Sequence, residues 1–340
     1  MRKPSLKAAL VATGTVFLAT AATAVAAYTP SLTGQQNGSK TTIHVVSAKT
    51  DDSTAAIHIL SPSAANLTAT PGTTIGTVTA SINAKAISPD AVIPLTGSVI
   101  VADPTKYVSA TDAQCSGAPA NTAVWNLSLT AAGQTLNVPV YVNPAPASLA
   151  ALGVQTVMVT CLASPDVGAA CAATLCAKLL DVNFTVDGVF TKGTSPTWIS
   201  EFTPYTPGTA NPNVAGTVTA LGLDIKPVVT LTAKAGKGKA VLAGRVTLAG
   251  QGVPGFPVVL LKGTKRLGIV KTNSAGSYVY TAKLKKGPYS FLAGTSAPEL
   301  PLGTAGCAAI PAGTPGLGPC VSSTIPQFTV LSKIVKVKVS

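Results

Sequence analysis

Residues 242–261 read Leu-Ala-Gly-Arg-Val-Thr-Leu-Ala-Gly-Gln-Gly-Val-Pro-Gly-Phe-Pro-Val-Val-Leu-Leu, two apolar runs around a turn rich in Gly and Pro. Val, Leu and Phe favour strands, and the Gly-Gln-Gly and Pro-Gly steps favour tight turns. Glycine suits such turns because it adopts positive φ without steric cost. Working outward, we expect strands over 228–233 and 239–248, in a unit that begins near residue 226.

Two motifs follow this segment. A hairpin signature spans Thr272-Asn273-Ser274-Ala275-Gly276-Ser277-Tyr278, and Gly287-Pro288-Tyr289 opens another strand. Together with Gly-Arg-Val-Thr at 244–247 and Gly-Phe-Pro-Val at 255–258, they make residues 241–293 resemble bacterial Ig-like, carboxypeptidase-regulatory-like (Cna-B-like) domains. The resemblance implies a β-sandwich and is almost silent about function.

Some Cna-B-like domains carry a Lys–Asn isopeptide crosslink promoted by a buried carboxylate. In residues 226–340, Asn273 is the one asparagine and Glu299 the one acid. Asn273 falls in the predicted hairpin turn, where turn chemistry accounts for it. We therefore expect no crosslink.

The rest of the chain is also β-prone. Of 340 residues, 46% are hydrophobic, only 5% are aromatic, and 31 Gly and 26 Pro supply turns. The runs expected to be strands between residues 53 and 225 are 55–60, 74–83, 91–102, 123–130, 134–142, 154–162, 179–190 and 214–223. The Pro- and Gly-rich stretch 191–213 is expected to be a surface loop. Regular spacing of short strands predicts an all-β chain of tandem Ig-like β-sandwich domains after an N-terminal signal peptide.

The predicted organisation has four parts. Residues 1–27 form a signal peptide, 28–52 a flexible start and first strand, 53–225 a β-sandwich domain, and 226–340 a basic Ig-like β-sandwich domain. The signal peptide has a cationic start, an apolar stretch and small residues that favour cleavage after Ala26 or Ala27. No later run reaches the length of a membrane span, so the mature chain is expected to have no transmembrane segment and to be secreted or associated with the cell envelope.

The six cysteines all lie in the predicted mature chain, which favours disulfides in an exported protein. Proximity favours Cys307–Cys320 and Cys171–Cys176, which leaves Cys115–Cys161, although fifteen connectivities are possible. The alternative of a zinc site is weaker, because the spacings are Cys-x4-Cys and Cys-x12-Cys and no histidine is near. The Gly-, Pro- and Ala-rich excursion 295–319, closed by Cys307 and Cys320, is expected to be a loop restrained by this crosslink.

Groups that carry catalysis are scarce. The chain has only His44 and His58, and 11 Asp and Glu residues. A metal pair of the two histidines, and a calcium contact at Asp51-Asp52, are both weaker interpretations than ordinary structural roles. Phosphate-loop, GxSxG and HExxH motifs do not occur. We expect no catalytic residue, no cofactor and no metal site.

Charge is divided sharply between the two halves. Residues 28–225 hold six Lys and ten acids, whereas residues 226–340 hold fifteen Lys and Arg and one Glu, a net charge of +14. Such a balance attracts polyanions. The lysines expected to make contact are Lys283, Lys285 and Lys286 at a hairpin end, and Lys336 and Lys338 on the outer face of the final strand.

These features predict a non-enzymatic, secreted or surface-associated protein in envelope binding, adhesion or structure. Its partners would be anionic cell-envelope polymers or host glycans, without specific nucleic-acid recognition, because stacking aromatics are few. The alternative is a secreted hydrolase acting on polysaccharide or peptide, with the Ig-like unit as an accessory module.

Overall fold

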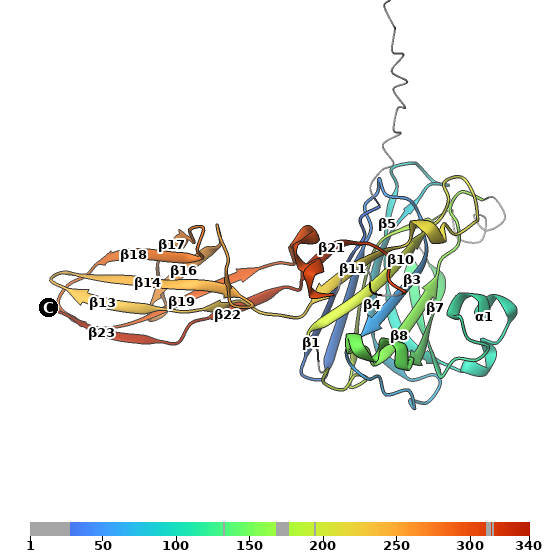
Figure 1. Cartoon of the computed structure of the whole chain (residues 1–340), viewed down its shortest axis with the longest axis horizontal. Coiled ribbons are helices and arrows are strands. Elements are labelled where there is room, and N and C mark those ends of the chain that lie inside the picture. The colour runs from blue at the N-terminus through green and yellow to red at the C-terminus, as the bar shows by residue number, and fades with distance from the viewer. Residues whose placement is uncertain (1–27, 132, 168–176, 194, 311–313, 315) are drawn as a thin grey trace, which may run out of the picture.

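The structure is a computed structural model that describes residues 28–131, 133–167, 177–193, 195–310, 314 and 316–340 (Figure 1). The predicted signal peptide and the predicted pair Cys171–Cys176 lie outside the described residues. The all-β, sandwich-like class predicted from the sequence is confirmed: nearly all regular structure is strand.

The strands are β1 Ser31–Asn37, β2 Lys40–Val46, β3 Thr54–Ser61, β4 Thr74–Ala84, β5 Val92–Ala102, β6 Ala123–Ala131, β7 Gln134–Pro144, β8 Thr156–Cys161, β9 Ala177–Asp187, β10 Thr197–Pro204, β11 Val218–Leu223, β12 Val228–Val229, β13 Thr232–Gly236, β14 Lys239–Leu248, β15 Gln251–Gly252, β16 Pro257–Lys262, β17 Lys265–Lys271, β18 Ser277–Lys283, β19 Gly287–Ala297, β20 Leu300–Pro301, β21 Cys320–Ile325, β22 Phe328–Leu331 and β23 Val335–Val339. The helical pieces are α1 Ala110–Ser116 and the 3-10 turns η1 Pro104–Lys106, η2 Ala147–Leu152, η3 Val214–Gly216 and η4 Gly303–Ala309.

The first unit is one continuous sheet that curls on itself. We call it the rolled sheet; its strand order is β1-β2-β9-β4-β5-β6-β7-β8-β3-β10-β11-β21-β20. In Figure 1 its strands surround a common interior. The interior holds a chain of edge-to-face aromatic contacts, Trp125 to Phe190 at 5.8 Å and Phe190 to Trp198 at 5.9 Å between ring centroids. The inner face of a single curled sheet thus encloses the core, whereas a sandwich builds its core between two sheets.

Glycines allow the rolled sheet to close. β1 passes against β10 and β11, so its backbone must come very near theirs. A Cβ placed on Gly34 would lie 2.2 Å from the Trp198 ring, and one on Gly222 would lie 2.8 Å from the Gly34 nitrogen. Because only a hydrogen fits in either position, these two residues fix where the curled sheet meets itself.

The chain start is more ordered than the flexible segment predicted over 28–52. β1 and β2 form a hairpin whose tight turn is Gly38-Ser39, with Gly38 at φ 64°. Leu32, Ile43 and Val45 are buried in the rolled core. Burial of this alternating apolar face, which the composition of the segment does not reveal, explains the order.

The loop predicted over 191–213 is wrong, because this stretch contains β10 between β3 and β11. Trp198 and Phe202 are fully buried there. Prolines on both sides suggested a loop, but Pro196 precedes the strand and Pro204 ends it, where a missing N–H costs little.

The second unit is a β-sandwich made of residues 227–297 and 327–340, which we call the sandwich. One sheet is β12-β14-β13 with β15 and β18 on β14, and the other is β17-β16-β19 with β22 and β23 on β19. Leu242, Val258, Leu260, Phe291 and Val339 fill the space between them. This arrangement is compatible with the Ig-like sandwich that the resemblance implies.

Residues 298–326 leave the sandwich and join the rolled sheet; we call them the strap. β21 pairs in parallel with β11, and β20 pairs with β21. The loop expected over 295–319 is therefore partly wrong, because this segment carries β20 and η4. Sequence pattern could not reveal the pairing, since it joins segments far apart in the chain.

Candidate functional site

The end of the sandwich remote from the rolled sheet carries the turn between β13 and β14 and the end of β23 (Figure 1). The strands that reach this end bear several lysines. We call this set the basic tip; its members are Lys237, Lys239, Lys262, Lys265, Lys283, Lys285, Lys286, Lys336 and Lys338. The β13–β14 turn, the end of β18 and the start of β19 meet here, because the Gly238 nitrogen donates to the Ser340 carbonyl at 3.1 Å and the Leu284 nitrogen donates to the Gly238 carbonyl at 2.9 Å.

Two pairs of basic residues face each other directly across strand ladders in the basic tip. Lys239 on β14 is opposite Lys283 on β18. Lys262 is opposite Lys265 across the β16–β17 hairpin. Like charges at directly opposed positions destabilise a sheet. Lys262 gains some compensation from the Tyr289 ring, whose centroid lies 5.3 Å from its amine.

The last strand adds a basic outer face, as its alternation predicted. On β23, Lys336 and Lys338 are exposed, whereas Val339 is buried. Lys338 pairs with Pro288 and Lys336 with Ser290 in the β19 ladder. The two lysines therefore lie beside the first residues of β19, immediately after Lys285 and Lys286.

No Asp or Glu occurs in the sandwich, because the one acid of residues 226–340, Glu299, belongs to the strap. Glu299 is turned to the rolled sheet, where its carboxylate accepts hydrogen bonds from His44 Nδ1 at 2.7 Å and Thr33 Oγ1 at 2.8 Å. Among the described residues, no Lys or Arg of the sandwich forms an ion pair with a carboxylate. In the described part of the chain, the lysines of the basic tip thus have no carboxylate side chain paired with them.

All five lysines singled out in the sequence are exposed in the basic tip. Sequence reasoning missed Lys237, Lys239, Lys262 and Lys265. Their proximity depends on ladders between segments distant in sequence, so only the excess of Lys over acids across 226–340 could have pointed to them.

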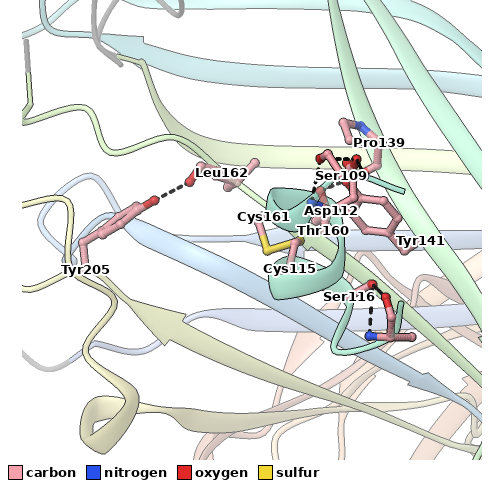
Figure 2. Close-up of a disulfide and its surroundings, with 11 residues drawn as sticks. Ser109, Asp112, Cys115, Ser116, Pro139, Tyr141, Thr160, Cys161, Leu162 and Tyr205 are labelled. Carbon is pink, nitrogen blue, oxygen red and sulfur yellow. Dashed lines mark hydrogen bonds between the residues drawn. A yellow bond between two sulfur atoms is a disulfide. The ribbon is translucent and has the colours of Figure 1, made fainter. Parts of the chain in front are cut away.

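Four of the cysteines form two disulfides, with the pairing that proximity favoured. Cys115 on α1 is bonded to Cys161 at the end of β8, with the Cα atoms 5.9 Å apart (Figure 2). Cys307 on η4 is bonded to Cys320 on β21, with the Cα atoms 5.8 Å apart. The second disulfide closes the strap on itself where it meets β11.

The two histidines lie on separate strands that do not pair with each other. His44 on β2 also contacts Asp181, with 2.7 Å between Nε2 and Oδ2. Hydrogen bonds to Asp181 and Glu299 raise the pKa of His44 to about 9. His58 on β3 is opposite Glu201 and Val159, and its burial lowers its pKa. Each histidine therefore has a structural setting of its own.

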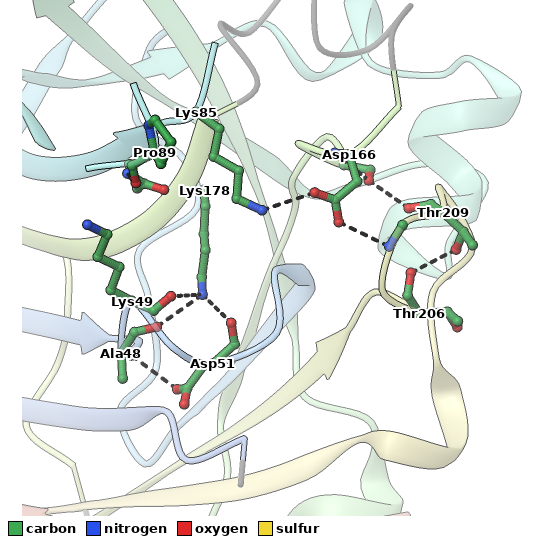
Figure 3. A network of polar contacts seen from close by, with 12 residues as sticks. Ala48, Lys49, Asp51, Lys85, Pro89, Asp166, Lys178, Thr206 and Thr209 are labelled. Carbon is green, nitrogen blue, oxygen red and sulfur yellow. Dashed lines mark hydrogen bonds and ion pairs between the residues drawn. The ribbon is translucent and has the colours of Figure 1, made fainter. Parts of the chain in front are cut away.

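The acidic pair considered for calcium is part of a turn. The Asp51 side chain accepts a hydrogen bond from the Ala48 nitrogen at 3.1 Å (Figure 3). The buried Lys178 amine donates to the carbonyls of Ala48 at 3.1 Å, Lys49 at 3.0 Å and Asp51. A cation from the chain itself thus occupies the carbonyl cluster that a metal would need.

A polar cleft of about 510 Å³ lies beside Trp198 in the rolled sheet. Asp224 is the one carboxylate in its described lining, and Oδ2 of Asp224 accepts a hydrogen bond from the Gln36 nitrogen at 2.9 Å. Burial raises the pKa of Asp224. Most glycoside hydrolases use two carboxyl groups, so this lining does not supply that pair.

Within the described part of the chain, no helix has the length and apolarity of a membrane span, and no cluster of three or more His, Cys, Asp or Glu side chains forms a metal-binding group.

Comparison with known proteins gives little guidance. No family model and no curated protein matches the chain. Among solved structures, it is similar to native alpha-2-macroglobulin from Escherichia coli spanning domains MG0-NIE-MG1, at 9% identity and a TM-score of 0.16, over 78% of this chain and 60% of that one. The chain therefore spans less than two thirds of that protein's solved length.

Proposed function

We propose that this is a non-enzymatic protein of the cell exterior whose basic tip binds anionic polymers of the envelope or anionic host glycans. The observation that carries the proposal is the presence of two pairs of directly opposed lysines, Lys239–Lys283 and Lys262–Lys265, in a sandwich without any Asp or Glu. This arrangement costs folding energy that solubility alone does not require.

A polyanion removes that cost. Phosphate, sulfate or carboxylate groups spaced along a polymer can lie between several exposed amines at once, and binding releases counterions from both partners. The flexible amines of the basic tip suit a repeating anion better than a single shaped ligand, because Lys acts as a point charge without fixed geometry. We therefore expect affinity that depends on charge density and falls steeply with salt.

The exterior location is supported by the two disulfides, which persist in oxidising compartments. A mature chain starting at Ala27 or Tyr28 is expected. Intact mass of protein recovered from the culture medium checks this, and a mass that begins at Met1 would contradict export.

The binding test uses the whole chain, because the strap lies between β19 and β22 in sequence but pairs with β11 of the rolled sheet, so separate fragments would expose the β11 edge. One variant replaces Lys283, Lys285, Lys286, Lys336 and Lys338 by Gln. Its matched control replaces five exposed lysines outside the basic tip by Gln: Lys40, Lys106, Lys192, Lys226 and Lys271. Both variants lose the same charge.

Retention on heparin and on immobilised polyphosphate is measured across a salt gradient. The basic-tip variant should elute at much lower salt than the wild type, and the control only slightly earlier. Equal losses in the two variants would mean that net charge alone acts. No binding by the wild type at low salt would make the sandwich a spacer. Turnover of polysaccharide or peptide substrates by the purified chain would favour the hydrolase alternative.

A further inference from the structure

The interior of the rolled sheet is not filled. A cavity of about 270 Å³ lies among side chains of strands β2 to β9, including Val45, Ile59, Leu95 and Phe184. Its described lining is apolar apart from Asn137 and Thr160. Protein interiors contain few voids larger than a water molecule, and an apolar cavity of about 150 Å³ stays dry and accepts benzene. A larger apolar space therefore fits an apolar ligand better than water.

Several lining residues that are not fully buried lie on both sides of a seam between β7 and β8, where we place the entrance of the cavity. These neighbouring strands pair only from Tyr141–Val159 to Pro144–Thr156. Beyond this point, the part of β7 that extends to Gln134 pairs with β6, and the part of β8 that extends to Cys161 pairs with β3. In the described chain, these two parts do not pair with each other. Leu136, Val138 and Leu162, half-buried at this seam, line the cavity.

The seam has fixed edges. The disulfide to Cys115 holds the end of β8 against α1, and the Tyr205 hydroxyl donates to the Leu162 carbonyl at 2.6 Å (Figure 2). The Thr160 hydroxyl crosses the seam, where its Oγ1 donates a hydrogen bond to the Pro139 carbonyl at 2.9 Å. Where ladder pairing between β7 and β8 has ended, this side-chain contact joins the two edges of the seam.

We propose that this cavity binds the alkyl chain of a single-chain amphiphile, such as a fatty acid or a monoacyl lipid. The apolar lining would leave a polar ligand's groups without hydrogen-bond partners, which excludes sugars and peptides from the interior. In the described lining, the polar side chains Asn137 and Thr160 belong to β7 and β8 at the seam, so the alkyl chain lies inside and the polar end lies near Asn137. This site is separate from the basic tip.

Dodecanoic acid and uncharged 1-dodecanol are suitable probes for calorimetric titration of the whole chain. Both should bind, because the alkyl chain supplies the affinity. Ala80→Leu adds bulk to the cavity wall and should weaken both probes at least tenfold while the protein keeps its thermal transition. If Ala80→Leu fails to fold, Leu95→Ala provides the opposite test: by enlarging the cavity, it should raise the preference for hexadecanoic over dodecanoic acid.

The seam gives two further readouts. Asn137→Asp, at an exposed position, should weaken dodecanoate several-fold and leave 1-dodecanol unchanged, because only the acid brings a second negative charge. Thr160→Val keeps the side-chain shape but removes the bond across the seam, and should speed binding and release together.

Three results would overturn the proposal: no binding of either probe up to its solubility limit, unchanged affinity in folded Ala80→Leu, or loss of dodecanoate binding in the five-lysine variant of the basic tip with Ala80→Leu unaffected. The last would place the fatty acid on the polyanion surface. Failure of heparin binding leaves this test intact, since the two sites share no residue.

Discussion

The rolled sheet and the sandwich are both all-β, but they treat charge in opposite ways. In the rolled sheet, two of the six lysines of residues 28–225 and one histidine are paired with carboxylates: Lys85 with Asp166 at 3.0 Å, Lys49 with Asp90, and His44 with Asp181 and Glu299. The sandwich contains no Asp or Glu. This contrast in charge pairing supports the proposal that the sandwich binds an external anion.

The two units also differ in how completely apolar side chains fill their interiors. The sandwich fills the space between two sheets with Leu242, Leu260 and Phe291. The rolled sheet leaves a cavity. The geometry of a closed sheet fixes the radius of its interior, and the side chains that point inward do not fill all of that volume. A fold that closes through Gly34 and Gly222 can therefore hold space that a stacked pair of sheets would not.

The largest expected effect is on the junction between the units. Replacing Cys307 and Cys320 by Ser releases a short crosslinked loop in the strap and should lower the free energy of unfolding by about 3 kcal/mol. With the strap loosened, we expect scanning calorimetry to resolve two transitions where the wild type gives one. The Cys115→Ser/Cys161→Ser pair is the control, because it also loses a disulfide but lies within the rolled sheet. Two transitions already in the wild type would show that the strap does not couple the units.

The next largest expected effect is a loss of stability when the closure of the rolled sheet is disturbed. Gly34→Ala places a methyl group against the Trp198 ring and should cost about 2 kcal/mol, measured by denaturant unfolding. Gly236→Ala in the sandwich is the matched change, because its Cβ would meet nothing nearer than 3.6 Å. If the two variants are equally stable, the rolled sheet does not close as tightly as the structure has it.

The two histidines should give pH dependences of opposite sign. His44 has a raised pKa in the folded state, about 9, so its stabilisation is complete below the unfolded value near 6.5 and is lost as pH rises through 9. His58 has a lowered pKa, so its burial costs stability as pH falls below about 6.5.

His44→Gln should therefore remove on the order of 1–2 kcal/mol at pH 6 and little at pH 10. Melting temperatures across pH 5–10 check this, with His58→Gln as the comparison. A His44→Gln penalty that grows with pH would mean that His44 is neutral between its two carboxylates.

The smallest expected effect is a gain in the free energy of unfolding. Lys239→Gln removes one of two directly opposed lysines and should raise stability by about 0.5 kcal/mol while reducing heparin retention. Lys234→Gln on β13 is the control, since Lys234 faces Val241 across its ladder. A loss of stability in Lys239→Gln would show that the opposed amines are held apart and repel little.

Local pattern predicted most strands but not their partners. Alternation of Val and Lys placed 335–339 as a strand with an outer basic face, and β3 to β9 fall on the expected apolar runs. The sequence pattern did not predict β10, because prolines lie just before it and at its end. It did not predict the pairing of the strap, because β21 pairs with β11, which lies before the first strands of the sandwich in the chain. The candidate site followed the same division: the excess of lysine is visible in composition, whereas the opposition of Lys239 to Lys283 exists only after two distant strands pair.

The strap also fixes the order in which the protein can be completed as it emerges from the ribosome or a translocation channel. β11 has an open edge until β21 arrives, and β21 follows residues 226–319 in the chain. The sandwich in turn lacks β22 and β23 until after the strap has passed. The rolled sheet is therefore complete once β21 has paired, when the sandwich still lacks β22 and β23. Strand β23 then adds Lys336 and Lys338 to the basic tip. A chain halted at residue 326 would hold a closed first unit and no finished binding surface.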